Sequence, residues 1–550
     1  MSRFVPTTAT VIPAKAGTHL PTRIARGPAR RHAVKFGRCV PAFAGMTVAV
    51  LLSACTLGPN FHPAPTPPAA AGRFVAADSI AVSSEPLPAR WWQLYDDPVL
   101  DALVTEALTA NTDVRVATAN LRRARAVLSE TRSLRLPTTN LSASASYLRS
   151  NGSSGSGGSG STGGGATGTG TTGTGTGTTG TGTGTGTGGT STTGVSGGGG
   201  YEGQFYSAGL DVSYELDLYG RVRRDIEASR ADVAAVAAQR DTVRTSVAAE
   251  TARAYADACS AAAQLAVARQ SLELQQQTYQ LTETLAFAGR GTPLDTSRAR
   301  AQYEQVRATL PPFAAARRDA LFRLSVLTGH APEEVPAAAA ACTVPPRLRR
   351  ALPVGDGTTL LQRRPDIRQA DRALAAATAR IGVATASLYP QVRLGGSIGT
   401  SAISLGGLTS DGGFRFNVGP LLSWTFPNVT VARARIRQAR ASSEAALATF
   451  DGTVLTALRE TETALNDLSS ELDRQAALTA QRDFSAEASR IVGLRYGAGK
   501  ENFLAVLDAQ RTLTQAEAAL AASRAALIDD EVAAFKALGG GWDAPDPARR

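Results

Sequence analysis

Apolar and polar residues alternate along four short stretches of the chain, with the two-residue period of a β-strand that has one apolar face. Each stretch is close to the roughly 9 to 11 residues that a strand needs to cross a bilayer. The sequence therefore predicts four membrane-spanning strands. These stretches are Asn140–Tyr147, Tyr206–Leu216, Gln391–Ile398 and Phe414–Phe426.

A second pattern predicts long helices. Residues 221–287 contain neither proline nor glycine, and four of their valines recur at steps of 3, 7 and 4 residues, as in a coiled coil. A helix of this length reaches on the order of 100 Å, so it has to pack lengthwise against other helices. A matching stretch from Val431 to Tyr496 is interrupted only by Gly452 and Gly493. A shorter helical pattern runs from Pro98 to about Arg135.

Both patterns occur twice, which indicates an internal duplication. Asn111–Val114 matches Arg364–Ile367, 253 positions later. Ala249–Thr251 matches Arg459–Thr461, 210 positions later. The difference between the two offsets is close to the length of a Gly/Ser/Thr tract at 151–200. We therefore expect two copies of one unit, the first interrupted by the tract.

The duplication and the composition of the N-terminal part divide the chain into a leader, a tether and two repeats. The tract has a composition that cannot bury a core, and we expect it to be disordered. The expected parts are a signal peptide (1–54), a lipidated tether (55–90), a first repeat (91–335) with the insertion 149–203, a linker (336–360), a second repeat (361–541) and a tail (542–550).

Four strands cannot close a barrel alone, because single-chain bacterial barrels have at least about eight and lipid does not tolerate open strand edges. The chain is therefore expected to oligomerise. The two strands of each copy are joined by the tract or by residues 402–412, so both loops lie at one end of the sheet and the helices leave from the other. We expect the loops outside the cell and the helices in the periplasm.

The first 54 residues have the order of a secretory leader: a basic stretch, an apolar run at Val48–Leu52, small residues and then Cys55. Leu52–Cys55 resembles the lipobox of bacterial lipoproteins, in which the cysteine receives a diacylglycerol. The alternative is an ordinary buried cysteine. Thr56 at the next position favours transfer to the outer membrane, and an echo within the leader suggests that the true start lies downstream.

Charge and histidine content argue against other classes of protein. The leader holds eight Lys and Arg and no acid, so most of the net charge of +11 belongs to it and a nucleic-acid role loses its support. The four histidines lack ligand spacing, and no nucleophile elbow with plausible partners appears. We expect no enzyme and no cofactor besides the lipid on Cys55. Whether Cys259 and Cys342 pair is open.

Several motifs carry a family resemblance: Cys55–Phe61, Trp91–Pro98, Arg363–Ile367 and the glycine-containing turns with their following Ala-Gln. Taken together, they resemble the outer-membrane efflux lipoproteins of the NodT and OprM type, relatives of TolC. The resemblance implies a homotrimer whose twelve strands form one outer-membrane β-barrel, continued by an α-helical tunnel in the periplasm. It also implies a periplasmic adaptor and an inner-membrane pump, most often of the resistance-nodulation-division class, with the chain passively conducting small molecules.

Two Gly-x-Gly turns end the long helices and match each other at an offset of 208: Gly289 with Gly291, and Gly497 with Gly499. Glycine supplies the positive φ that such turns require. By resemblance, these turns are the periplasmic tips that adaptors grip.

The same resemblance assigns Tyr496 and Asp508 to the closed end of the tunnel. The family's second gating acid falls at Ala505, which departs from the pattern. The alternative reading of Asp508 is a solvated residue on a helix face. For the whole chain, the alternatives are a periplasmic adaptor or a surface structural lipoprotein, which explain neither the strands nor the duplication.

Overall fold

A computed structural model describes residues 56–63, 72–76, 82–83, 85, 87–150 and 201–540. The chain divides into two units, Met1–Ala54 and Cys55–Arg550, and every described element belongs to the second. The expected leader, Cys55, residues 151–200 of the tract and the tail 542–550 lie outside the described residues.

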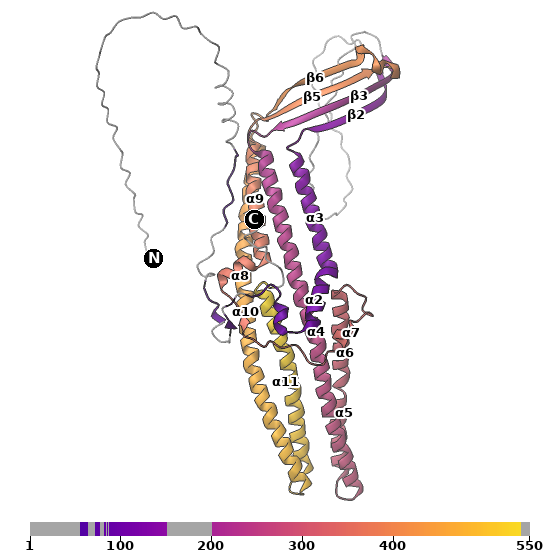
Figure 1. The fold of residues 1–550 in the computed structure, drawn as a ribbon, viewed down its shortest axis with the longest axis vertical. Helices are drawn as coiled ribbons and strands as arrows, with labels where there is room; N and C mark the ends of the chain where they lie inside the picture. The colour runs from indigo at the N-terminus through magenta and orange to yellow at the C-terminus, as the bar shows by residue number, and fades with distance from the viewer. Residues whose placement is uncertain are drawn as a thin grey trace, which may run out of the picture. The chain divides into compact units, whose positions relative to one another are not determined.

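One antiparallel sheet of four strands confirms the predicted strands (Figure 1). Its spatial order is β2-β3-β5-β6, so each predicted pair forms a hairpin and β3 joins β5 between the hairpins. The connections at 151–200 and 403–413 therefore leave from the same end of the sheet. The strands are β2 (Thr138–Ser150), β3 (Tyr201–Leu216), β5 (Gln391–Ala402) and β6 (Phe414–Ser423).

The pairing register puts the apolar positions of all four strands on one face. Because side chains alternate along a strand, rows of cross-strand neighbours share a face. One row is Leu141, Leu210, Ile398 and Phe416, and the next row, on the opposite face, is Asn140, Asp211, Ser397 and Asn417. The apolar row is exposed within the chain, with Leu141 at 80% and Phe416 at 76% of full exposure.

The helices follow the predicted pattern closely, and both long helices form. The shorter pattern from Pro98 is two helices, because the side-chain oxygen of Asn111 accepts hydrogen bonds from the backbone of Asp113 and Val114 and starts a new helix. The bounds are α2 (Pro98–Ala110), α3 (Thr112–Ser133), α4 (Arg221–Phe287), α5 (Pro293–Arg307), α6 (Leu310–Leu327), α7 (Ala337–Ala340), α8 (Gly357–Arg363), α9 (Pro365–Ala386), α10 (Thr430–Gly497) and α11 (Phe503–Ala537).

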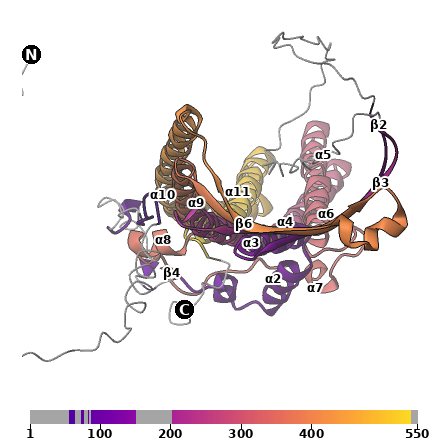
Figure 2. The same ribbon diagram turned by 90° about the horizontal axis from the view of Figure 1, so that it is seen from above.

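Four helices form a row, with α3, α4, α9 and α10 packed in that order below the sheet. Further from the sheet, α4 packs on α5, α6 and α11, and α11 packs on α10. Figure 2 shows α2, α7, α8 and β4 on one face of the row. Among the described helices, none combines the length and apolar character needed to cross a bilayer.

The main core lies where the short elements cover the row. Trp91, in the short helix η3 (Trp91–Tyr95), stacks on Phe535 of α11 with ring centroids 4.6 Å apart. Phe74 and Leu87 are buried in the same core. Strand β1 (Val82–Ser83) pairs in parallel with β4 (Leu352–Pro353).

These contacts change the expectation for residues 55–90, whose described parts are packed against the helices instead of running as a free tether. The reason is the apolar residues between the prolines, which have a core to enter.

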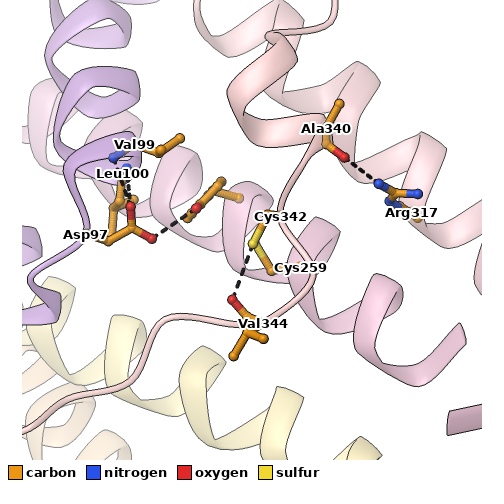
Figure 3. The surroundings of a disulfide bond; sticks show 9 residues. Asp97, Val99, Leu100, Cys259, Arg317, Ala340, Cys342 and Val344 are labelled. Atoms are coloured by element: carbon orange, nitrogen blue, oxygen red, sulfur yellow. Dashed lines mark hydrogen bonds between the residues drawn. A yellow bond between two sulfur atoms is a disulfide. The ribbon is translucent and has the colours of Figure 1, made fainter. Parts of the chain in front are cut away.

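A disulfide joins Cys259 of α4 to Cys342, just after α7 (Figure 3). The sequence left open whether these two cysteines pair, and the structure shows that they do. Cys259 is fully buried in the main core, and Arg317 of α6 donates to the carbonyl of Ala340 beside the bond. The linker between the two halves of the chain is therefore attached to the centre of α4.

Candidate aperture at the helical hairpin tips

The helices that lead away from the sheet end in two hairpins with the same backbone turn. Gly289 has φ +72° and its N–H donates to Ala286 O at 3.1 Å, while Arg290 N–H donates to Leu285 O at 2.8 Å. In the other hairpin, Gly499 has φ +70° and donates to Tyr496 O at 2.9 Å. Lys500 N–H completes it by donating to Arg495 O, also at 2.9 Å. Each long helix thus ends in a Schellman motif with glycine in the left-handed conformation.

The helix starts that follow the turns also correspond. Thr292 caps α5 by accepting from Asp295 N–H at 3.2 Å, and Asn502 caps α11 by accepting from Ala505 N–H at 2.9 Å. Turns and caps both align at an offset of 210, so the predicted offset of 208 is wrong for these hairpins. The offset of 208 came from aligning the first glycines of the two Gly-x-Gly motifs. The left-handed position is held by the first glycine in one turn, Gly289, and by the second glycine in the other, Gly499.

The four predicted tip glycines differ in what they require. Gly289 and Gly499 need their positive φ. A Cβ on Gly291 would lie 3.0 Å from Ala286 N, which is tighter than ordinary packing. Gly497 is the last residue of α10, and a Cβ there meets nothing within 4 Å. Three of the four positions therefore have a conformational or steric reason for glycine.

Tyr496 lies in a small apolar cluster that joins the two hairpins. Its ring is 5.9 Å from that of Phe503, and both belong to a cluster with Leu507 of α11, Ala299 of α5 and Tyr279 of α4. The four helices α4, α5, α10 and α11 thus meet at this point.

Burial, and then the nearby carboxylate of Asp295, raise the pKa of Tyr496. Asp295 is a site residue that sequence reasoning missed. Its signal was present: at the offset of 210, Asp295 corresponds to Ala505, the position where the resemblance stated above implies an acid.

Asp508 is exposed on α11, one residue beyond the apolar cluster. Its backbone carbonyl accepts a hydrogen bond from Thr512 Oγ1 at 2.9 Å. Within the described residues its carboxylate has no hydrogen bond or ion pair. The structure therefore leaves this charge in contact with solvent beside the cluster, whereas Tyr496 is inside it.

Further from the tips than this cluster, polar contacts between α4 and α11 also hold the two hairpins together. Gln510 of α11 donates to Thr278 of α4 at 3.0 Å, and Ser271 donates to Glu517 at 3.3 Å. Thr278 and Gln510 are both buried. Because these pairs come from residues more than 200 positions apart, no local pattern could have indicated them.

Nearer the main core, a cleft of about 400 Å³ opens between α4, α9, α10 and α11. Its lining mixes both signs of charge, including Lys536, Asp467 and Asp530. Burial, and then the carboxylates of Asp467 and Glu471, raise the pKa of Asp530 to about 6. In the part of the chain that the structure describes, no group of three or more His, Cys, Asp or Glu side chains could hold a metal ion.

Comparisons with known proteins identify the family that has this architecture. The sequence matches the family described as outer membrane efflux protein over residues 178–330 and 358–540. It is 29% identical over 521 residues to the outer membrane protein OprJ of Pseudomonas aeruginosa, covering 92% of this chain and 97% of that protein. It is 30% identical over 463 residues to the pyoverdine export outer membrane protein OpmQ of the same species, covering 82% and 87%.

A solved structure agrees with these sequence matches. The structure of the outer-membrane channel OprN superposes with a TM-score of 0.76 at 34% identity, covering 89% of this chain and all of that one. The likeness therefore includes the helices and the sheet together.

Proposed function

Because the chain belongs to the outer membrane efflux protein family, whose members are channels and not enzymes, it is an outer-membrane exit channel, and we propose that three copies form the working duct. The observation that carries this proposal is the exposed apolar face of a sheet that is open at both edges. Lipid would cover such a face, and further strands are needed to satisfy its edges.

Trimer formation is supported by the order of the elements. Within the described sheet, β2 and β6 are the edge strands, and α3 and α10 are the edge helices of the row beneath it. Joining the β6 edge of one copy to the β2 edge of the next would extend sheet and helices together. Three copies would supply twelve strands, enough to close a barrel.

The internal duplication explains why one chain carries two hairpins of each kind. The offset of 210 that relates the tip turns also relates Thr251 to Thr461, whose hydroxyls bond the carbonyls of Val247 and Ala457. Such recurrence supports two copies of one unit, as the sequence repeats do.

We place the helices in the periplasm and the anchor at the outer membrane. The support is the sequence of the leader, with cleavage before Cys55 and a diacylglycerol on its thiol. One or more acyl chains would add membrane affinity at about 0.8 kcal/mol per buried methylene.

The hairpin tips are the proposed contact for a periplasmic adaptor, which would connect the duct to an inner-membrane pump. By family resemblance, the proposed pump is of the resistance-nodulation-division class. Tyr496 and Asp508 are the proposed aperture residues, with Asp295 beside them. Opening would separate the hairpins and break the Tyr496 cluster and the Gln510–Thr278 hydrogen bond. The energy would come from the pump.

A periplasmic adaptor or a surface structural protein fits less well, because neither needs a sheet with one apolar face. Deleting the gene and measuring susceptibility to a panel of toxic compounds, with defined pumps present, tests the channel. We expect sensitivity that the intact gene restores; unchanged susceptibility to every compound would contradict it. A monomer after gentle detergent extraction would remove the shared barrel while leaving an export role open.

A further inference from the structure

The residues directly after Cys55 are held against the tunnel helices by one buried arginine. Arg224, in the first turn of α4, donates from Nε to Leu57 O at 3.1 Å and from Nη2 to Gly58 O at 3.2 Å. Nη2 also reaches Asn60 Oδ1 at 2.7 Å, and Nη1 pairs with Glu227 at 2.8 Å. The Arg224 side chain is only 5% exposed.

Three glycines bring the backbones together at the same place. Gly58 has φ +94°, and a Cβ there would lie 2.5 Å from the Cα of Gly382 in α9. A Cβ on Gly382 would lie 2.8 Å from Leu57 O, and one on Gly220 would lie 2.9 Å from the Cα of Thr56. Side chains cannot occupy these spaces, so the surface made by α4 and α9 fits this segment closely.

The contact lies where the sheet meets the helices. Leu57 N–H donates to Tyr219 O at 3.4 Å, in the short connection between β3 and α4. Tyr219 stacks on Tyr389, in the connection between α9 and β5, with ring centroids 4.7 Å apart. The segment is therefore fixed beside the two connections that carry the central strands β3 and β5.

We propose that Gly220, Arg224 and Gly382 form a docking site for the chain's own segment Thr56–Asn60, which sets the height of the lipid anchor at the base of the sheet. The inference rests on the proposed lipid on Cys55 for its biological meaning. An acyl chain on the residue before Thr56 would enter the bilayer within one residue of the docked segment.

The buried guanidinium of Arg224 explains why the segment Thr56–Asn60 occupies the site. A buried guanidinium without its acceptors is strongly unfavourable, and two backbone carbonyls plus an amide oxygen supply them here. Arg224 acts as a positioning residue. A long tether lacking this contact would let the anchor and the sheet occupy different heights.

Hydrogen exchange of the amides at 56–63 tests the docking directly, using full-length protein in detergent. Arg224→Met removes the donors, Gly382→Ala fills the groove, and Gly58→Ala places the added Cβ on the segment and leaves the sequence of the tunnel helices unchanged. Matched controls are Arg230→Met, on the exposed side of α4, and Gly452→Ala, where a Cβ meets nothing within 4 Å. Mass spectrometry of the N-terminal peptide reports the lipid.

We expect exchange at 56–63 to accelerate at least about tenfold in the three site variants and in neither control. Unchanged exchange in Gly58→Ala and Arg224→Met would overturn the docking site. A wild-type peptide without lipid would overturn the proposed anchor instead, and the exchange rates would still decide whether the segment docks.

Discussion

Asn111 and Arg364 occupy equivalent places in the two halves of the chain, each donating a hydrogen bond to a carbonyl at the end of a distant helix. Asn111 Nδ2 reaches Leu327 O in α6 at 3.0 Å, and Arg364 Nη1 reaches Ala537 O in α11 at 3.0 Å. The donors are 253 positions apart and the acceptors 210. Both side chains therefore tie a helix start on one side of the main core to a helix end on the other.

Replacing Asn111 by Ala removes the cap of α3 and leaves the Leu327 carbonyl without its donor. We expect a loss of about 2 to 3 kcal/mol, from one cap and one buried hydrogen bond. Thermal unfolding followed by circular dichroism measures it, with the exposed Asn120→Ala on the same helix as control. A variant as stable as the control would show that neither the cap nor the hydrogen bond to Leu327 contributes to stability.

The raised pKa of Glu531 predicts that the stability of the folded chain depends on pH. It is buried in the main core, where Tyr95 Oη donates to it at 2.9 Å, and burial raises its pKa to about 7, against 4.5 for a free glutamate. Between pH 4.5 and 7 the folded chain keeps a proton that the unfolded chain has lost, so stability falls as pH rises through this window and levels off above it.

Glu531→Gln should remove this fall. The shift corresponds to about 3 kcal/mol at most, so the variant should be the more stable protein at pH 8 and close to wild type at pH 4.5. Unfolding temperatures across pH 4 to 8 give the comparison, and Glu250→Gln, at an exposed position of α4, is the control. Parallel curves for wild type and Glu531→Gln would refute a shifted carboxyl.

The Cys259–Cys342 disulfide should stabilise the folded chain, because it closes a loop with a sequence separation of 83 residues. Chain-entropy arguments give about 4.5 kcal/mol as an upper value. Cys342→Ser should lower the unfolding temperature, and a reductant should lower that of the wild type to the same point without affecting the variant. A reductant effect on Cys342→Ser would point to some other thiol chemistry.

Asp508→Asn should weaken the cation preference of the channel without unfolding it, because the exposed carboxylate has no partner within the described residues. Three copies around an axis would attract cations. Single-channel recording in asymmetric salt measures the preference, and Asp319→Asn, an exposed acid on α6, serves as control. Equal reversal potentials in wild type and Asp508→Asn would leave Asp508 as a solvated surface residue.

Gly499→Ala should disturb its hairpin tip, whereas Gly497→Ala should not. A left-handed residue with a Cβ costs about 1 to 2 kcal/mol, while alanine favours the helical conformation of residue 497. We expect faster hydrogen exchange at 496–502 and an affinity for the adaptor that falls about tenfold, only in Gly499→Ala. Similar affinities for both variants would argue that the adaptor does not use this turn.

Much of the architecture follows from local pattern. The helix predicted at 221–287 has those bounds in the structure, because it is rich in the helix formers Ala, Gln, Arg and Glu and no proline or glycine interrupts it. The break at Asn111 was missed because its cap looks like any polar residue within a helical period. The tip offset was wrong because two glycines per turn allowed two alignments.

The sequence alone determined the periods, and with them four strands with one apolar face and two long helices; closure of the sheet by further copies stays a prediction. Only the tertiary structure decided which distant groups meet: Arg224 with the segment after Cys55, Cys259 with Cys342, Tyr496 with Asp295. The physical reason is range. Periodicity reflects interactions between residues a few positions apart, whereas these contacts join residues from tens to hundreds of positions apart and exist only after the helices have packed.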